Sequence, residues 1–244
     1  MAYIENPKTK GSGIQCCIPQ TGTCPNNCAD CFFQSGRSYL EPLGENLPNM
    51  PFRADRVIRV NDGNDSNVGR EGVISATNCY PMRFFNTAIP KDIGGFPDPV
   101  ILTLNPGRMT DSKWHCLDPI PANLMAVRIR TNMWNLESVV DPAVAYYGGR
   151  DVPIFLTFMA YFIDSAKDGF QQYYCHRKRT MNSYSAITTA AWESVMARYK
   201  YNKWVYSCGR LEGEKSIELK ASGCRYCGNC LREYFATKER MEGK

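Results

Sequence analysis

Short runs rich in β-branched and aromatic residues recur along most of this chain, and they restrict the fold more than any other feature. Loops or helical segments separate the runs, and this alternation is typical of α/β proteins with a parallel sheet or barrel. We expect seven strands, at residues 14–20, 56–62, 82–89, 100–106, 124–131, 152–158 and 203–208.

Two segments between the strands predict helices. Residues 182–200 can be capped by Asn182 or Ser183, and apolar side chains then recur on one helical face. Residues 135–149 also start like a helix, but Pro142 must interrupt or kink it. Strands and helices therefore alternate over most of the chain.

Polar side chains share one face of several expected strands. Because side chains alternate along a strand, Arg128 and Arg130 point to the same face. The apolar Met125, Val127 and Ile129 point to the opposite face. Neighbouring strands repeat this division, with polar side chains at Arg59, Asn61, Thr103 and Asn105.

This polar face has two interpretations. A closed eight-stranded barrel fills its interior with Val, Ile and Leu, so a polar interior would imply an incomplete barrel that holds a ligand. Strands at a sheet edge, with one face in water, would give the same pattern.

Inside a barrel, Arg59, Arg128 and Arg130 would be costly without partners, because burying an unpaired charge costs several kcal/mol. A guanidinium matches carboxylate or phosphate, so we expect an anionic substrate.

The composition is that of an ordinary globular protein. Of 244 residues, 43 % are hydrophobic and 22 % charged, and the net charge is +5. No apolar run approaches the ~20 residues of a membrane span, and the first residues lack the apolar core of a secretory signal. We therefore expect a cytoplasmic protein with no membrane contact. Its twelve cysteines should be reduced there, and thiols at short spacing then favour metal over disulfides.

One cysteine cluster, Cys24, Cys28 and Cys31, follows the first expected strand. Structural zinc sites close with four ligands, and this segment supplies only three unless Cys16 or Cys17 joins them. A 4Fe-4S cluster held by three cysteines would instead leave one iron open to a substrate or cofactor.

A second cluster lies near the end of the chain. Cys208, Cys224, Cys227 and Cys230 supply four ligands, which suit either zinc or a second 4Fe-4S cluster. We therefore divide the chain into a barrel domain, residues 1–205, and a small Cys-rich metal-binding extension, residues 206–244.

The C-x3-C-x2-C spacing of the first cluster, in a loop after the first strand, resembles the radical S-adenosylmethionine (radical SAM) superfamily. The resemblance implies a partial (β/α)6 barrel over roughly residues 14–205 and a 4Fe-4S cluster on Cys24, Cys28 and Cys31. S-adenosylmethionine (AdoMet) would chelate the fourth iron and be cleaved reductively to a 5′-deoxyadenosyl radical. The C-terminal cysteines are similar to the auxiliary-cluster extensions of some members, although their spacing differs from the best-known pattern.

Other motifs of that superfamily are altered here. An aromatic residue usually precedes the third cysteine, whereas this chain has Asp30 there and Phe32 and Phe33 after it. The Gly-Gly-Glu turn that holds the AdoMet amino group reads "NDGND" at residues 61–65. The resemblance, with the polar strand faces, places AdoMet near Phe33, Asn61, Asp62, Gly63, Asn64, Thr103, Asn105, Arg128, Arg130 and Thr157.

The implied enzyme is oxygen-sensitive and needs a reductant such as flavodoxin or ferredoxin. Its anionic substrate is a peptide or protein side chain or a nucleotide. Cys175, beside His176, is a candidate hydrogen donor, although a structural or solvent-facing thiol fits the same position. The basic run at residues 175–179 predicts a solvated loop or an anion contact.

Two other functions fit the sequence. One is a non-enzymatic, zinc-stabilised nucleic-acid-binding module, and the other is an activase of a glycyl-radical enzyme. Only two histidines are present, so a Ser-His-Asp hydrolase or a multi-histidine metal site is not expected.

Overall fold

The computed structural model describes most of the chain. The described residues are 2–22, 24–26, 28, 31, 39–40, 44–49, 55–104, 116–158, 160–162, 166–178, 183–208 and 224–243. Two expected site residues, Phe33 and Asn105, lie outside them. Among the described residues, no helix has the length and apolar character of a membrane span.

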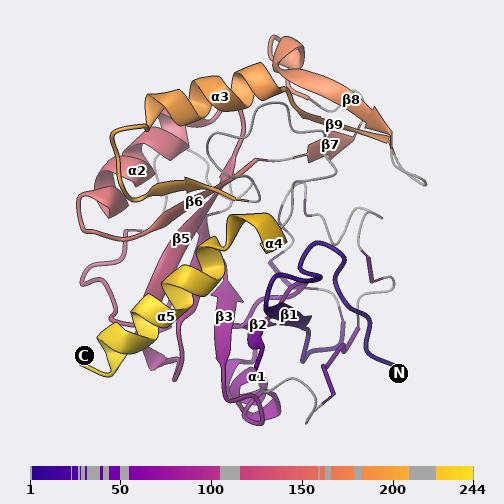
Figure 1. Ribbon diagram of the computed structural model, residues 1–244, viewed down its shortest axis with the longest axis vertical. Helices are drawn as coiled ribbons and strands as arrows, with labels where there is room; N and C mark the ends of the chain where they lie inside the picture. The colour runs from indigo at the N-terminus through magenta and orange to yellow at the C-terminus, as the bar shows by residue number, and fades with distance from the viewer. Residues whose placement is uncertain are drawn as a thin grey trace.

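Seven strands form one sheet in which every neighbouring pair is parallel (Figure 1). They are β1 (Ile14–Cys17), β2 (Val57–Val60), β3 (Arg83–Thr87), β4 (Val100–Leu104), β5 (Leu124–Thr131), β6 (Ile154–Phe158) and β10 (Val205–Ser207). The strands lie side by side in sequence order, and the sheet curls into a half-barrel. Each strand falls within its expected range, so the expected α/β sheet and its partial-barrel shape are confirmed at this level.

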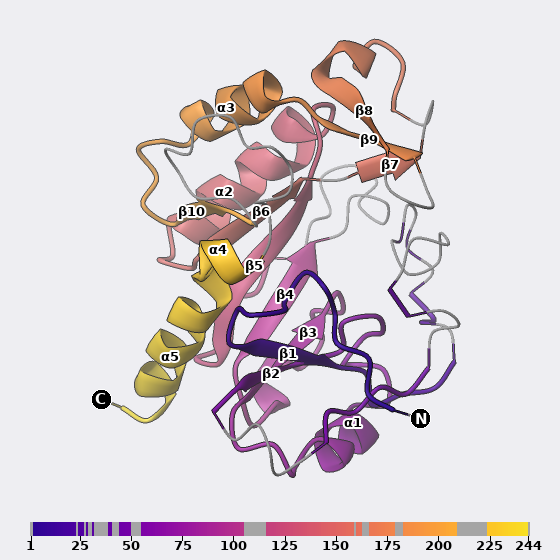
Figure 2. The same ribbon diagram turned by 45° about the vertical axis from the view of Figure 1, so that its right-hand side comes forward.

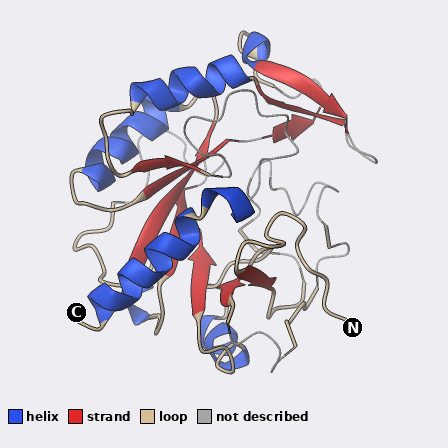
Figure 3. Ribbon diagram, viewed as in Figure 1, coloured by secondary structure: helices blue, strands red, loops and turns tan. Residues whose placement is uncertain are grey.

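Helices and short turns of helix join the strands. They are α1 (Arg70–Ala76), the 3-10 turns η2 (Ile93–Gly95) and η4 (Gln171–Tyr173), the π-helix η3 (Leu136–Val140), α2 (Asp141–Gly148) and α3 (Thr189–Arg198). Apolar side chains of α1, α2 and α3 form the main core with one face of the sheet. We call this face the outer face, and Figure 3 shows these helices in blue beside the red strands.

The two expected helices differ from the prediction. Pro142 lies in the first turn of α2, where its missing N–H is tolerated, and the turn before it is the π-helix η3. The helix expected over residues 182–200 is wrong in its first part, because residues 183–187 form a strand. Helix α3 begins only after Thr188, whose hydroxyl accepts a hydrogen bond from the backbone N–H of Ala191.

A small antiparallel sheet explains that difference. It has the order β7 (Ala160–Phe162), β9 (Ser183–Ile187) and β8 (Tyr174–Lys178), and β9 leads into α3 (Figure 2). Most of the basic run at residues 175–179 lies in the edge strand β8, so the expectation of a loop was wrong. The pairing of β9 with two partners overrides a sequence that also fits a helix.

Helices α4 (Cys224–Cys227) and α5 (Asn229–Met241) follow at the end of the chain. In Figure 1, α5 lies in front of β5. Its buried Cys230 and Tyr234 pack against side chains that point away from the outer face. We call this second face the inner face.

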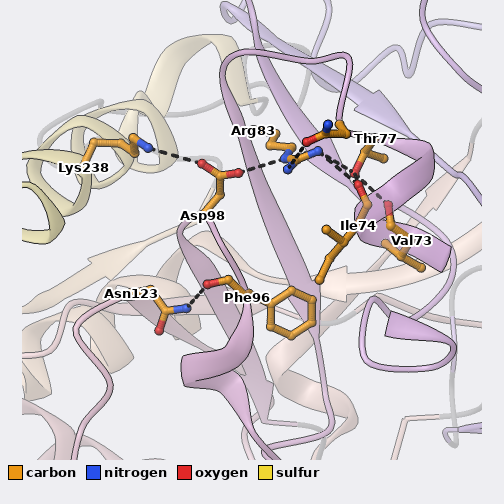
Figure 4. A network of polar contacts seen from close by, with 9 residues as sticks. Val73, Ile74, Thr77, Arg83, Phe96, Asp98, Asn123 and Lys238 are labelled. Carbon is orange, nitrogen blue, oxygen red and sulfur yellow. Dashed lines mark hydrogen bonds and ion pairs between the residues drawn. The ribbon is translucent and has the colours of Figure 1, made fainter. Parts of the chain in front are cut away.

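Polar contacts also hold α5 to the sheet. Arg240 donates to the backbone carbonyls of Ala122 and Leu124, and Lys238 lies 3.3 Å from Asp98. Asp98 also pairs with the buried Arg83 of β3 at 2.8 Å (Figure 4). The end of the chain is thus tied to β3 and to the start of β5.

The inner face has two layers. Apolar side chains form the layer nearer the start of the strands and pack against α5: Ile14, Val57, Phe84, Ile101, Ala126 and Phe155. Two residues further along each strand, on the same face, a polar layer follows: Cys16, Arg59, Asn86, Thr103, Arg128 and Thr157.

One residue, Met125, does not follow the expected alternation of side chains along β5. Met125 was expected on the face of Val127 and Ile129, but it packs under α5 with Ala126. The register between β4 and β5 shifts at Val100, and such a bulge places two consecutive residues on one face. Arg128 and Arg130 lie beyond the bulge and still share the inner face.

Candidate functional site

The three cysteines of the first cluster follow β1 at the carboxyl edge of the sheet. All three side chains are half-buried, and the backbone N–H of Cys31 donates to the carbonyl of Cys28 at 3.2 Å. Burial raises the pKa of Cys24, and the charges of Asp65, Cys28 and Cys31 raise it further. The three thiols therefore lie within electrostatic reach of one another.

Asp65 ties this loop to the sheet. Its buried carboxylate accepts hydrogen bonds from the side-chain amide of Asn26, in the cysteine loop, and from the hydroxyl of Thr87, both at 2.7 Å. The backbone N–H groups of Ala88 and Asn67 donate to it at 2.7 and 2.9 Å. Sequence reasoning missed this role, because only the fold brings the ends of β2 and β3 to the loop.

The turn after β2 lies beside the end of β1. Asn61 has a left-handed backbone (φ 61°), and its N–H donates to the carbonyl of Cys17 at 2.8 Å. Its side-chain amide donates to Ser66, whereas its buried Oδ1 has no hydrogen-bond partner among the described residues. Gly63 and Asn64 are half-buried. The turn thus holds a buried acceptor without a hydrogen-bond partner among the described residues.

Asp62, in the same turn, already has partners. It accepts from Arg59 at 2.6 Å and makes a short hydrogen bond with the side-chain amide of Asn6. Burial alone would lower the pKa of Arg59, because it disfavours the charged guanidinium. The negative charge of Asp62 and the smaller contributions of Cys16, Cys224 and Cys230 together outweigh this effect, so the pKa lies above its usual value. Arg59 is therefore not the unpaired cation that the sequence suggested, and Asn6 is a partner that the sequence did not reveal.

The remaining expected residues lie along the polar layer. Arg128 is 9 % exposed and donates to Oδ1 of Asn86 at 3.1 Å, and it pairs in register with Thr103. Arg130 is half-buried and pairs in register with Thr157. The hydroxyl of Thr157 is buried and has no hydrogen-bond partner among the described residues. These side chains line the inner face toward the carboxyl ends of β4 to β6.

Three other cysteines named from the sequence lie in different surroundings. Cys17 packs into the outer-face core, so it cannot complete the first cluster. Cys16 is buried on the inner face, 3.5 Å from the hydroxyl of Thr9. Cys175 is half-buried in β8, opposite Ala186 of β9. A role for Cys175 as hydrogen donor stays a prediction.

The four C-terminal cysteines come from three elements. Cys208 follows β10 and donates its N–H to Leu156, and Cys224 begins α4 with its N–H bonded to the carbonyl of Lys8. Cys227 ends α4, and Cys230 lies in the first turn of α5; both are buried. Gly228, with φ 59°, turns the chain between the two helices.

Two of these thiols have pKa values shifted by burial, by the other thiols and by the inner-face arginines. Burial raises the pKa of Cys224 to about 12, with Cys208, Cys230 and Cys227 adding to the shift and Arg59 opposing it. Burial likewise raises the pKa of Cys230 to about 11, against the opposing effect of Arg128 and Arg59. Such thiols need a cation before they can ionise.

The described cysteines of neither cluster form a complete metal site. Within the described ranges, no three His, Cys, Asp or Glu side chains meet in a geometry that could hold a metal ion. The donor chemistry is that of a thiolate-bound metal, because both clusters consist of cysteines and all twelve cysteines are present as thiols. A comparison with known protein families, with characterised proteins and with solved structures found no match.

Proposed function

We propose that this protein is a radical AdoMet enzyme, with a 4Fe-4S cluster on Cys24, Cys28 and Cys31. The proposal is that it cleaves AdoMet to methionine and a 5′-deoxyadenosyl radical, which takes hydrogen from an anionic substrate. One observation carries the proposal. The three thiols follow the first strand of a curled parallel sheet, at the carboxyl edge where such sheets bind ligands, beside a polar inner face.

The residues around this edge suit AdoMet. The buried Oδ1 of Asn61 can accept a hydrogen bond from the ammonium group, and Arg130 can pair with the carboxylate. The buried hydroxyl of Thr157, with Thr103 beside Arg128, can bond the ribose hydroxyls. When bound, the cluster supplies the low-potential electron for cleavage. The protein's own part is to orient the groups and exclude water.

The substrate class follows from the same arginines. Arg59 pairs with Asp62, and we assign Arg130, which lies further toward the carboxyl edge, to an anionic group of AdoMet or of the substrate. A peptide or protein carboxylate and a nucleotide phosphate both fit a guanidinium. A flavodoxin or ferredoxin would deliver the electron in the cell.

The decisive experiment compares the parent protein with Cys28→Ala and Cys79→Ala. Cys79 is an exposed thiol outside both clusters, so its variant is a matched control. Anaerobically reconstituted parent and Cys79→Ala should contain iron and sulfide and release 5′-deoxyadenosine with dithionite. Cys28→Ala should release none above background. Continued release by Cys28→Ala would contradict the proposal.

The same measurements separate the alternatives. A zinc-stabilised nucleic-acid-binding module predicts a colourless protein that contains zinc and binds oligonucleotides in a salt-dependent manner. An activase of a glycyl-radical enzyme predicts the iron and the 5′-deoxyadenosine, with a glycyl radical formed on a partner enzyme.

A further inference from the structure

A pocket of about 750 Å³ lies between the end of α2 and the turn that joins α3 to β10. Its volume is typical of ligand pockets, which span roughly 300–1,000 Å³. These two segments lead directly into β6 and β10, so the pocket lies at the amino edge of the parallel sheet, whereas the cysteine loop lies at the carboxyl edge. The lining includes Gly148, Asp151, Tyr201, Asn202, Lys203 and Trp204.

Backbone contacts hold the two walls of this pocket together. They approach closely because Gly148 has no side chain, and a Cβ there would lie 2.7 Å from Nδ2 of Asn202. Asn202 also shapes the turn, since its N–H donates to the carbonyl of Tyr199 at 2.8 Å and its Oδ1 accepts from the N–H of Trp204 at 3.0 Å. The N–H of Ile154 donates to the carbonyl of Trp204 at 2.7 Å, which ties the turn to β6.

Two aromatic rings of the turn each have a lysine beside them. Nζ of Lys200 lies 4.7 Å from the ring centroid of Tyr201, and Nζ of Lys203 lies 4.8 Å from that of Trp204. The indole N–H of Trp204 donates to Asp151 at 2.8 Å, which orients this ring. Tyr201 is 90 % exposed, so it contributes nothing to the core and most of its ring is open to solvent.

The surface around the pocket is positively charged. Residues 144–151 and 198–204 contain one acidic side chain, Asp151, and four basic side chains, Arg150, Arg198, Lys200 and Lys203. Asp141 compensates Arg198 through a short ion pair. The other three cations form no ion pair with a carboxylate in the part of the chain that the structure describes. These cations therefore remain for an anionic ligand.

We propose that this pocket and the basic residues around it bind single-stranded nucleic acid. The ring of Tyr201 stacks on an unpaired base, and Lys200 and Lys203 pair with phosphates. Sequence-tolerant binding of single strands combines these two elements, exposed aromatic rings and a positively charged groove. An acidic peptide would use the cations but not the exposed ring, so nucleic acid fits the surface better. The inference goes beyond the proposed function, and the surface contains no residue of either cysteine cluster.

Stacking is tested by fluorescence anisotropy of the full chain with labelled oligouridylate and oligothymidylate of about 12 nucleotides. Tyr201→Ala should bind them about ten-fold more weakly, whereas Tyr201→Phe, which keeps the ring, should stay within about three-fold of the parent. Phe235→Ala removes a half-exposed ring from α5 and is the matched control, so its affinity should equal that of the parent. Tighter binding of either oligonucleotide would support the proposal and identify the preferred sugar.

The phosphate contacts are tested by the salt dependence of the same binding. The double variant Lys200→Gln/Lys203→Gln should reduce the slope of log affinity against log salt concentration by about 1.4, because each phosphate contact on a single strand contributes about 0.7. Lys10→Gln, at an exposed position outside this surface, should keep the slope of the parent.

Three outcomes would overturn the proposal: no binding of either oligonucleotide by the parent at low salt, equal losses in Tyr201→Ala and Phe235→Ala, or an unchanged salt slope in the double lysine variant. Displacement of the oligonucleotide by oligoaspartate, with equal affinity in the parent and in Tyr201→Ala, would also contradict it and indicate an acidic protein partner. Iron analysis and 5′-deoxyadenosine release are measured separately from this binding, so the proposed function fails or survives independently.

Discussion

The side-chain amide of Asn26 donates a 2.7 Å hydrogen bond to the buried carboxylate of Asp65, and this contact joins the cysteine loop to the sheet. Asp65 also accepts hydrogen bonds from the hydroxyl of Thr87 and from the backbone N–H of Ala88, at the end of β3. One carboxylate therefore holds three separate segments together. The position of the first cysteine cluster depends on it.

We expect Asp65→Ala to lower the free energy of unfolding by roughly 3 kcal/mol, because several buried donors lose a charged acceptor. The iron bound at the first cluster should fall with it, since the loop loses its anchor. Urea denaturation and iron analysis measure the two effects. Asp55→Ala, at an exposed position, should change stability by about 0.5 kcal/mol or less. Equal effects of the two variants would contradict the anchoring role.

The network in Figure 4 predicts that losing both ion pairs of Asp98 costs more than losing only its pair with Lys238. Asp98→Ala leaves the buried Arg83 without its carboxylate and should cost about 3 kcal/mol. Lys238→Met breaks only the more exposed pair at 3.3 Å, which should cost less than about 1 kcal/mol. Denaturant unfolding of both variants compares the costs, and a larger loss for Lys238→Met would show that the pair with Arg83 contributes little.

Two adjacent aromatic residues of α5 test how firmly the helix binds the inner face. Tyr234 is buried against Phe84, whereas Phe235 is 50 % exposed. Tyr234→Ala should lower stability by about 3 kcal/mol, because it opens a cavity under the helix. Phe235→Ala should cost less than about 1 kcal/mol. Similar losses, measured by thermal and urea unfolding, would mean that α5 does not depend on this contact.

Buried thiols should make the protein less stable in alkaline solution. Burial raises the pKa of Cys16 and Cys17 above the usual range. Above about pH 8.5, these thiols ionise in the unfolded chain but stay protonated in the folded one. Unfolding then releases protons, so stability falls as pH rises, by about 1.4 kcal/mol per pH unit for each thiol.

The variant Cys17→Ala isolates this effect. Between pH 8.5 and 9.5, its free energy of unfolding should fall by about 1 kcal/mol less than that of the parent. Val73→Ala, which truncates the same core without removing a titratable group, should keep the parent's slope. If the slopes of the parent and of Cys17→Ala agree, the buried thiol does not contribute to the pH dependence.

Arg130 is the inner-face cation that we assign to AdoMet or substrate. Arg130→Ala should weaken AdoMet binding by about ten-fold, or about 1.4 kcal/mol, if it pairs with the carboxylate. Equilibrium dialysis of anaerobically reconstituted protein measures the affinity. Unchanged AdoMet affinity and unchanged substrate turnover would leave Arg130 as part of the scaffold.

The sequence by itself determined the strands of the large sheet. Each strand is a local pattern of apolar and β-branched residues, and a parallel sheet buried on both faces keeps that pattern intact. The sequence also predicted that Arg59, Arg128 and Arg130 share one face, because alternation along a strand is a local property. Local patterns failed at residues 183–187, where pairing with β7 and β8 selects a strand, and at Met125, where a bulge turns the side chain.

Only the tertiary structure decided which polar groups meet. Asn6 reaches Asp62 across 56 residues, Asn26 reaches Asp65 across 39, and Cys230 arrives beside Val57 and Ala126 only because α5 packs on the inner face. No local spacing encodes such contacts, since they depend on the curl of the whole sheet and on apolar burial summed over many residues. The sequence could therefore indicate where thiols and arginines gather, whereas the packing of distant segments decided that Arg59 is neutralised and that the C-terminal cysteines lie against the same face as Arg128.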